Sequence, residues 1–491
     1  MLNRSHRIAI VAVVFTMLLA DRSLGDFQSL AKKLPPETNV LVAINVAKIL
    51  NSPYSKQQDW AGNLAEKWQT RPLMVPPGVN RLVMGADLDP KTIDSTWQMC
   101  LMEMLQMPSM DSIAQAHRGY VDRVWDKNAI VSPQNAYFVP LDDKTLASLT
   151  PASRRTIAKW LRQPADGGMT SVYLKTVAMG LSDNTDITMA LDLEGAFAVP
   201  AARKWLDDNE MPEFKGQNLD AIARQFGHIN GLRLDVSIDN DINARGTVSF
   251  DQDAAVLGPV AKPLTIGILK YAGMALPDLD DWKFATSGKT VTMEGKLSEA
   301  SLRNLLSLVQ SPIPSTGTTD STAANQTPAG QPLDPAVASQ KYYKFICMIL
   351  DNLSAKTSLA DTSTWFKNSA RRIEQAPILN VDPALVEWGA MVTTKLKEVA
   401  AMTAIGQTQT SARAASLQSS AVDYGAYTYD ASGKFYSKVS AEGEANRQQR
   451  RQAASEQKAQ AQQQGAQMLA DIPSSRAKIR TEMTAKYKIE F

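Results

Sequence analysis

The feature that most constrains the fold is strict alternation of apolar and polar residues in two adjoining segments. In the first, Leu232, Leu234, Val236 and Ile238 alternate with Arg233, Asp235, Ser237 and Asp239. After a turn, the apolar positions of the second are Ile242, Ala244, Gly246, Val248 and Phe250. A period of two places successive side chains on opposite faces of a strand. The pattern therefore predicts a β-hairpin over 231–250 with one buried face and one face in water.

The same plan is then repeated along the chain. A helix is expected over 257–272, and a second pair of strands is indicated by Trp282 and Phe284 and by the apolar positions between 291 and 297. A further helix is predicted over 299–309. Two strand–strand–helix units in tandem favour the α+β class, with antiparallel sheets and helices packed on one side.

The residues before this region continue the mixture of strands and helices. Apolar runs predict strands over 39–46, 81–88, 96–104, 136–141 and 187–193, and helical spacing predicts helices over 57–69, 151–162, 171–181 and 199–206. The chain of 491 residues is too long for one ordinary domain. We therefore expect an α+β body over 26–310, built as one unit or as two subdomains, 26–165 and 166–310.

Beyond the body the composition changes twice. Residues 311–338 are rich in Ser, Thr, Pro, Gly, Ala and Gln, as is typical of a flexible linker. Apolar stripes at helical spacing then predict a small helical bundle over 339–405, with Asp382 capping a helix that has Pro383 at its first position. Residues 406–491 are predicted to form a polar tail, helical or disordered, with a short terminal helix after Pro473.

The first 25 residues have the pattern of an export signal. Arg4, His6 and Arg7 precede an apolar run from Ile8 to Ala20, which is shorter than the roughly 20 residues that span a bilayer. We expect cleavage of 1–25, no transmembrane segment afterwards, and export to a periplasmic or extracellular site in the cell envelope. In that oxidising setting Cys100 and Cys347 have two alternatives, a disulfide or two separate buried thiols.

Composition excludes several classes of function. The formal net charge is only +2, with 52 basic and 50 acidic side chains, so overall charge gives no reason to expect a nucleic-acid partner. Two cysteines are too few for a disulfide-rich scaffold or a cysteine-based zinc module.

A group of sulfur-bearing side chains is the candidate metal site. Met99, Cys100, Met102 and Met104 lie close together, and thioether and thiolate ligands select Cu(I). Alternation along a strand sends Met99 to one face and the other three to the opposite face. The alternative is therefore a strand buried on both faces, in which methionine fills the core.

Two short motifs resemble ligand-binding loops only in part. Ser287-Gly288-Lys289-Thr290 resembles the end of a phosphate-binding loop, but Lys283 stands where that loop needs glycine, and the segment is expected within a hairpin. Residues 239–243 have acidic and amide side chains at calcium-loop spacing, but Ala244 and Phe250 replace the required Gly and Glu. Both motifs are interpreted as hairpin turns, and no cofactor is predicted.

The remaining candidates are histidines, paired acids and a basic stretch. Hydrolase-type chemistry would draw on His117 or His228, or on the acid pairs Asp183 with Asp186, Asp207 with Asp208, and Asp280 with Asp281. Their positions beside turns and helix ends equally indicate solvent-exposed acids. A basic group in the tail consists of Arg447, Arg450 and Arg451.

Three short motifs together resemble a known family. They are Leu34-Pro35-Pro36-Glu37-Thr38-Asn39-Val40, then Leu379-Asn380-Val381-Asp382-Pro383, and finally the segment from Met483 to Phe491. The combination is similar to an uncharacterised family of signal-peptide-bearing exported proteins of planctomycete-type bacteria. The resemblance implies export and transfers no functional residue.

The sequence therefore predicts an exported, non-enzymatic protein that binds or scaffolds a protein or surface component of the cell envelope. A flexible connector, a helical module and a polar tail suit interaction better than turnover. Two alternatives stay open: a hydrolase-type enzyme with a site of scattered Asp, Glu, Ser and His, and a protein that handles copper through the Met/Cys group.

Overall fold

The computed structural model describes most of the chain, with gaps. The described residues are 27–60, 78–89, 94–117, 119–132, 135–163, 168–209, 211–308, 335–353, 362–374, 376, 378, 380–419, 427–429, 435–437, 456, 459–460 and 462–491. The export-signal prediction for 1–25 and the basic group at 447–451 lie outside these residues.

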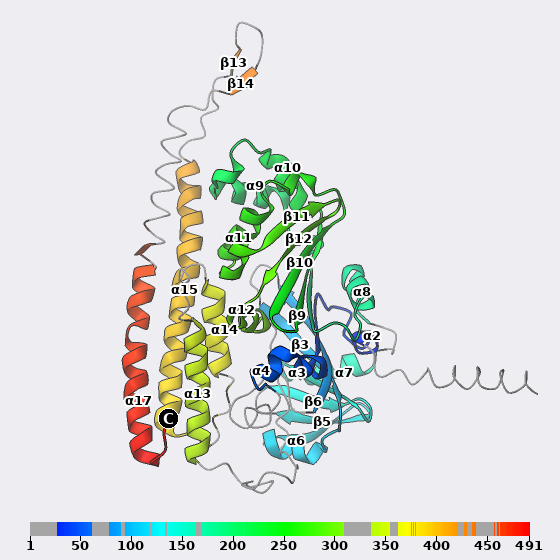
Figure 1. Cartoon of the computed structure of the whole chain (residues 1–491), viewed down its shortest axis with the longest axis vertical. Helices are drawn as coiled ribbons and strands as arrows, with labels where there is room; N and C mark the ends of the chain where they lie inside the picture. The colour runs from blue at the N-terminus through cyan, green and yellow to red at the C-terminus, as the bar shows by residue number, and fades with distance from the viewer. Residues whose placement is uncertain are drawn as a thin grey trace, which may run out of the picture.

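A twelve-stranded sheet forms the centre of the body (Figure 1). Every strand pairs with its neighbours in the antiparallel sense, and the order across the sheet is β11-β12-β10-β9-β8-β1-β2-β3-β7-β6-β5-β4. The strands are β1 Val40–Asn45, β2 Val79–Asp89, β3 Asp94–Met104, β4 Tyr120–Val124, β5 Lys127–Ser132, β6 Ala136–Pro140, β7 Thr145–Thr150, β8 Ile187–Asp192, β9 Ile229–Ile238, β10 Ile242–Phe250, β11 Lys283–Ser287 and β12 Thr290–Lys296.

The centre of the sheet is buried on both faces. Along β1, Val42 and Ile44 face the first core, whereas Leu41 and Ala43 face the second core on the opposite side. All six residues of β1 are buried, which explains why its sequence is a continuous apolar run rather than an alternation. The β9–β10 hairpin alternates because its polar positions, such as Ser237 and Arg245, stay exposed.

Helices cover each face of the sheet. The second core receives α2 Phe27–Ala31, α7 Arg154–Leu161 and α8 Val172–Met179. The first core and the adjoining cluster on its side receive α3 Val46–Asn51, α4 Pro53–Gln57, α6 Met110–His117, α9 Val199–Asp208, α10 Leu219–Phe226, α11 Ala261–Tyr271 and α12 Glu299–Leu306. Short 3₁₀ turns lie at Pro212–Phe214, Ala255–Leu257 and Pro277–Asp281.

The predicted α+β class is confirmed. The two tandem units are β9-β10-α11 and β11-β12-α12, and both of their helices lie on one side of the sheet, as predicted. On the second face, the helices of the described residues that pack on the core are α2, α7 and α8, all from the amino-terminal half of the chain. The sheet crosses the predicted boundary between subdomains 26–165 and 166–310, because β1 pairs with β8.

The helix expected over 57–69 is described only over its first four residues. The spacing of Trp60, Leu64 and Trp68 predicted a helix over 57–69, but α4 ends at Gln57 and residues 58–60 form a turn. Trp60 packs edge-on against Tyr54, with their ring centroids 5.5 Å apart, so its burial comes from the turn rather than from a helical stripe. Residues 61–69 lie outside the described residues.

The carboxy-terminal region is helical, and its boundaries differ from the prediction. It contains α13 Pro335–Leu353, α14 Ser363–Glu374, α15 Pro383–Ser419 and α17 Asp471–Tyr487, which share a third core. Helix α13 begins inside the predicted linker 311–338, and α15 extends beyond the predicted bundle limit at 405. The terminal helix α17 belongs to the bundle, since Ile479 and Met483 are buried in the third core. Within the predicted tail, Tyr427–Tyr429 and Phe435–Ser437 form the small hairpin β13–β14.

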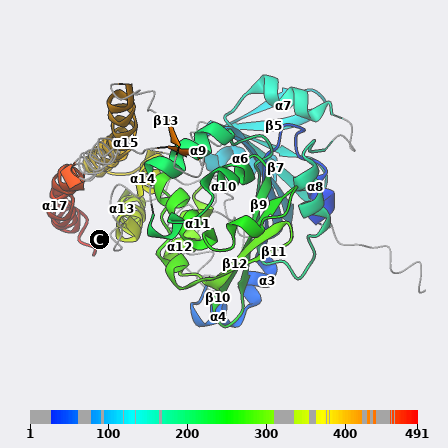
Figure 2. The same ribbon diagram turned by 90° about the horizontal axis from the view of Figure 1, so that it is seen from above.

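The bundle contacts the body through the start of α14. The indole N–H of Trp365 donates to the carbonyl oxygen of Ala275 at 3.0 Å, and the hydroxyl of Thr364 donates to that of Ala272 at 2.7 Å. The Trp365 side chain is buried at this contact. Figures 1 and 2 show the bundle alongside the body, on the side opposite α7 and α8.

Two of the motifs behind the family resemblance meet inside the bundle. The Tyr487 hydroxyl donates to the Asp382 carboxylate at 2.8 Å, and the Lys486 ammonium lies 2.6 Å from the same oxygen. Burial acts to raise the pKa of Asp382, but hydrogen bonds from Lys486, Tyr487 and the Ala384 N–H outweigh it and lower this pKa. We call Asp382, Lys486 and Tyr487 the Asp382 junction; it fastens α17 to the start of α15.

Within the described residues, no helix combines the length and the apolar character needed to cross a membrane.

Candidate functional site

The strongest candidate for a binding surface is the outer side of α7. Ser153 caps this helix, since its hydroxyl oxygen accepts a hydrogen bond from the Thr156 N–H at 3.2 Å. Ile157 and Trp160 point inward and are buried in the second core, which turns the remaining positions toward solvent. Those positions line an open hollow of about 640 Å³, and four of its five lining residues are basic: Arg154, Arg155, Ala158, Lys159 and Arg162.

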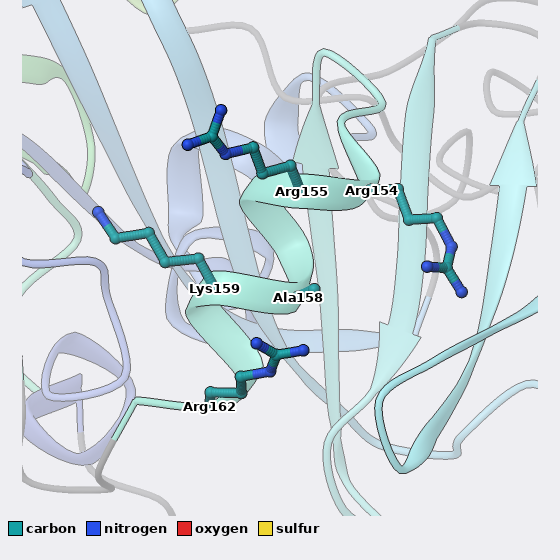
Figure 3. A pocket seen from close by; sticks show the side chains of 5 residues that line it. All are labelled: Arg154, Arg155, Ala158, Lys159 and Arg162. Carbon is teal, nitrogen blue, oxygen red and sulfur yellow. The ribbon is translucent and has the colours of Figure 1, made fainter.

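The four basic side chains are held differently. Figure 3 shows Arg155 and Lys159 extending to one side of the helix and Arg154 to the other. Arg154 is held to the β4–β5 hairpin, because its Nε donates to Asp122 at 3.1 Å. The Lys159 ammonium pairs with Glu37, and its hydrogen bond is the main reason that the pKa of Glu37 is lowered.

The other two arginines carry the excess charge. Among the described residues, neither Arg155 nor Arg162 is paired with a carboxylate, and both side chains are exposed. Each of the two guanidinium groups is always charged and offers several N–H donors in a fixed plane. The helix therefore presents two cations that have no carboxylate partner in the described part of the chain and that suit oxyanions.

An exposed tryptophan adjoins these cations. Trp125 lies at the tip of the β4–β5 hairpin, is 58% exposed, and has the Arg162 guanidinium 4.5 Å from its ring centroid. Its φ is +58°, in the left-handed region that bulky residues seldom adopt. A strained, exposed aromatic residue contributes little to the core and is typical of a binding position. We define the α7 surface as Arg154, Arg155, Lys159, Arg162 and Trp125.

The acid pair Asp183 and Asp186 belongs to a different cluster, at the ends of β1, β2, β3 and β8. Arg81 is buried there, with its Nε 2.7 Å from Glu103 and its Nη1 2.9 Å from Asp183. Asp186 is also buried; it lies 2.7 Å from the Lys48 ammonium and accepts a hydrogen bond from the Ile238 N–H at 2.8 Å. Asp183 pairs with Arg81, which it shares with Glu103, whereas Asp186 pairs with Lys48, so these ion pairs join strand ends and do not pair Asp183 with Asp186.

The other acid and histidine candidates are not brought together either. Asp207 and Asp208 pair within α9 with Arg203 and Lys204. His228 lies 2.8 Å from Asp251 through its Nδ1, where β9 begins and β10 ends. The side chain of His117 lies outside the described residues, and Asp280 and Asp281 are in a 3₁₀ turn.

The two loop-like motifs are turns. Residues 239–241 connect β9 to β10, where Asp241 pairs with Lys296 at 2.8 Å. Gly288 connects β11 to β12 with a φ of +51°, a conformation that glycine adopts readily. The segment Ser287–Thr290 thus lies in a hairpin, as expected.

The sulfur-bearing candidates lie on β3 and divide between its two faces. Met99 is buried in the second core, whereas Cys100, Met102 and Met104 are buried in the first. An ion bound by Met99 would therefore be on the opposite side of the sheet from the other three side chains. Cys347 is buried in the third core, so the two cysteines are not joined to each other. Among the described residues, no three His, Cys, Asp or Glu side chains are grouped to hold a metal ion.

The α7 surface was not singled out from the sequence. The helix itself was predicted over 151–162, and the basic residues at 154, 155, 159 and 162 were a readable signal for an exposed cationic helix face. The contribution of Trp125 was not readable, because its approach to Arg162 and its positive φ depend on where the hairpin packs.

Comparisons with known proteins give little further information. No protein-family model matches the chain, and no curated protein matches it. The chain is similar to solved structures of a protein named TP0453. Crystal form I is 8% identical with a TM-score of 0.32, covering 57% of this chain and 96% of that chain. For crystal form IV the identity is 6% and the TM-score 0.28, covering 57% of this chain and 99% of that chain. A likeness at this level carries no argument about function.

Proposed function

We propose that the protein is an exported, non-enzymatic binding or scaffolding protein of the cell envelope, and that it recognises an anionic partner through the α7 surface. The observation that carries the proposal is the pairing of uncompensated cations with an exposed aromatic ring. Arg155 and Arg162 are exposed on α7, and the Arg162 guanidinium lies over the indole of Trp125.

Charge and shape both favour binding at this place. The hollow along α7 is open to solvent and lined mostly by basic side chains, which suits contact with a large partner more than enclosure of a small substrate. Helix α7 is fixed from below by Ile157 and Trp160 and at its start by Arg154 on Asp122. The cations therefore project from a rigid element, which reduces the entropy lost on binding.

The export proposed from the sequence of residues 1–25 would bring the protein to the cell envelope, so the expected partner is a component of the envelope. Outer surfaces of cell envelopes and their polymers are rich in phosphate and carboxylate groups, which Arg recognises through charge-assisted hydrogen bonds. Although the net charge of the chain is nearly neutral, the local excess of cations on α7 attracts anions to this face.

The proposal is tested with the full chain and an immobilised sulfated polysaccharide. Arg155→Gln combined with Arg162→Gln removes the two uncompensated cations. Arg224→Gln combined with Lys289→Gln removes two exposed cations, one on a helix and one in a hairpin turn, elsewhere on the body. We expect the first variant to elute at a clearly lower salt concentration than the wild type, and the second to elute with the wild type.

Location is tested separately, by sequencing the amino terminus of the protein recovered from envelope fractions of the producing cell. Cleavage near residue 25 is expected. Uncleaved protein in the cytoplasm, or equal elution of all three proteins from the polysaccharide, would contradict the proposed function.

A further inference from the structure

We infer that the anionic partner of the α7 surface is a lipid bilayer, met through the Arg-lined helix and the tip of the β4–β5 hairpin. The inference rests on the proposed function, since it identifies the partner of the same surface. It is drawn from the exposed apolar side chains that accompany the cations. A soluble polyanion offers no apolar environment in which these side chains could be buried, whereas a bilayer does.

The β4–β5 hairpin supplies aromatic groups. Trp125 at its tip is 58% exposed, and Tyr120 at the start of β4 is 65% exposed. Tryptophan and tyrosine are the side chains enriched at membrane–water interfaces, where the ring enters the apolar boundary and the polar atom stays hydrated. The hairpin also includes the edge strand of the sheet, β4, and Trp125 lies in the turn that joins β4 to β5.

Helix α8 supplies aliphatic groups on the same side of the sheet. Val172 is 73% exposed and Met179 is 66% exposed, and both are on the outer surface of this helix. Helices α7 and α8 pack on the same second core, and Figures 1 and 2 place both on the side of the sheet away from the helical bundle. Neither side chain can hydrogen-bond or stack with a sugar or phosphate, but both gain free energy by entering an acyl-chain boundary.

The charges complement an anionic membrane. Arg155 and Arg162 provide two cations without carboxylate partners among the described residues, and Lys159 is 66% exposed although it pairs with Glu37. Basic residues close to an anionic leaflet each strengthen partitioning by about a factor of five, and the attraction falls off within a Debye length. The combination of cations with exposed Trp, Tyr and aliphatic groups is the pattern of an interfacial binder, which lies on the membrane without spanning it.

Membrane binding explains why a tryptophan occupies the strained backbone position 125. A left-handed φ costs a bulky residue of this kind on the order of 1 kcal/mol, and glycine or asparagine would avoid most of it. The conformation directs the indole outward at the tip, where Arg162 covers one part of the ring and leaves the rest to solvent. A residue that serves only the fold would gain nothing from this arrangement.

The experiment uses full-length protein and sedimentation with sucrose-loaded vesicles. One set of vesicles is pure phosphatidylcholine, and the other contains phosphatidylglycerol as about a third of the lipid. We expect binding to the anionic set only, weakened by added salt. Arg155→Gln with Arg162→Gln should weaken partitioning roughly thirtyfold, and Arg224→Gln with Lys289→Gln should leave it unchanged. Trp125→Asn, which tolerates the positive φ, should weaken it roughly tenfold while leaving the thermal transition in place.

The outcomes separate this inference from the proposed function. Arginine-dependent retention on the sulfated polysaccharide without vesicle binding would overturn the bilayer as partner and leave the anion-binding surface standing. If the wild type and the Arg155/Arg162 variant elute equally from the polysaccharide, the proposed function is wrong, and the inference that rests on it is wrong as well. Vesicle binding by Trp125→Asn as tight as that of the wild type would overturn the assignment of the hairpin tip.

Discussion

Replacing Asp382 with alanine tests how the terminal helix α17 is held against the bundle. The Asp382 carboxylate is 2% exposed and accepts hydrogen bonds from the Tyr487 hydroxyl at 2.8 Å and from the Ala384 N–H at 3.0 Å. Its loss removes the cap at the start of α15 and leaves the Tyr487 hydroxyl without its acceptor. The substitution alters no side chain of α13 or α14, so its effect should be largest on α17.

The magnitude follows from these contacts. Loss of a helix cap costs about 1 kcal/mol, and loss of a hydrogen bond to a charged group costs about 1.5–3 kcal/mol. The lost cap lies on α15 and the lost hydrogen bond on α17, so we expect the free energy of opening α17 to fall by roughly 1.5–3 kcal/mol. Glu374→Ala is the matched control, because it removes another carboxylate of the bundle, one that pairs with Lys397 at the surface. An exposed pair contributes about 0–1 kcal/mol, so the control should change little.

Hydrogen exchange of the backbone amides in 471–487 is the assay, since it reports local opening without requiring two-state unfolding of the whole chain. The reasoning is refuted if Asp382→Ala leaves the protection of α17 unchanged, or if Glu374→Ala lowers it as much.

The same junction has a pH dependence whose sign can be worked out. The pKa of Asp382 is lowered in the folded protein, with burial opposing the shift and the hydrogen bonds from Lys486 and Tyr487 producing it. A lowered folded pKa means that the stabilisation is fully present above the unfolded value, about 3.9, and is lost as the pH falls through the folded value. Protection of α17 should thus be constant from about pH 7 to 5 and decline below about pH 4. A decline that is equally large in Asp382→Asn would show that another group is responsible.

Three further predictions concern packing. Gly231→Ala places a Cβ 2.3 Å from the Tyr173 ring and 2.6 Å from the Leu191 carbonyl oxygen. We expect the melting temperature to fall and the free energy of unfolding to decrease by about 1–3 kcal/mol. In the control Gly195→Ala the new Cβ meets no atom within 4 Å, so only the positive φ of this position opposes the substitution. Trp365→Ala should lower the free energy of unfolding by about 3–5 kcal/mol and increase proteolysis between body and bundle. Trp365→Phe should lose mainly the hydrogen bond to Ala275. Equal proteolysis of both variants and the wild type would contradict the importance of this contact. Met102→Leu should cost less than about 1.5 kcal/mol if the residue only fills the first core, and a Cu(I) titration of the same variant checks the metal hypothesis, which requires weaker binding.

Much of the fold could be predicted because local patterns fix it. The alternation over 232–250 requires one wet and one buried face, and it reproduces the β9–β10 hairpin in register from Ile238 with Ile242 onward. The tandem unit that follows was readable for the same reason. The helix expected over 57–69 can be compared with the structure only at 57–60, where α4 ends at Gln57 and Trp60 packs from a turn onto Tyr54.

The extent of the bundle was harder to read. The polar segment after 405 lacks an apolar stripe, yet α15 continues to Ser419. The role of α17 depends on distant residues, because Asp382 and Tyr487 are 105 positions apart. Neither motif contains a pattern that predicts its contact with the other. Capping by Asp382 was predictable from Pro383 beside it, whereas its contact with Lys486 was not.

The sequence by itself determined the elements with a clear period, such as the β9–β10 hairpin and helix α7, because periodicity depends on a few neighbours; it did not indicate β4, β5 or β7. It also determined that α7 would present basic side chains to solvent once Ile157 and Trp160 were buried. Only the tertiary structure decided that β1 and β8 join two halves into one sheet, and that Arg162 meets Trp125 from another element. Periodicity tells which face of an element is covered but not by what, so a surface assembled from separate segments becomes visible only when the chain is folded.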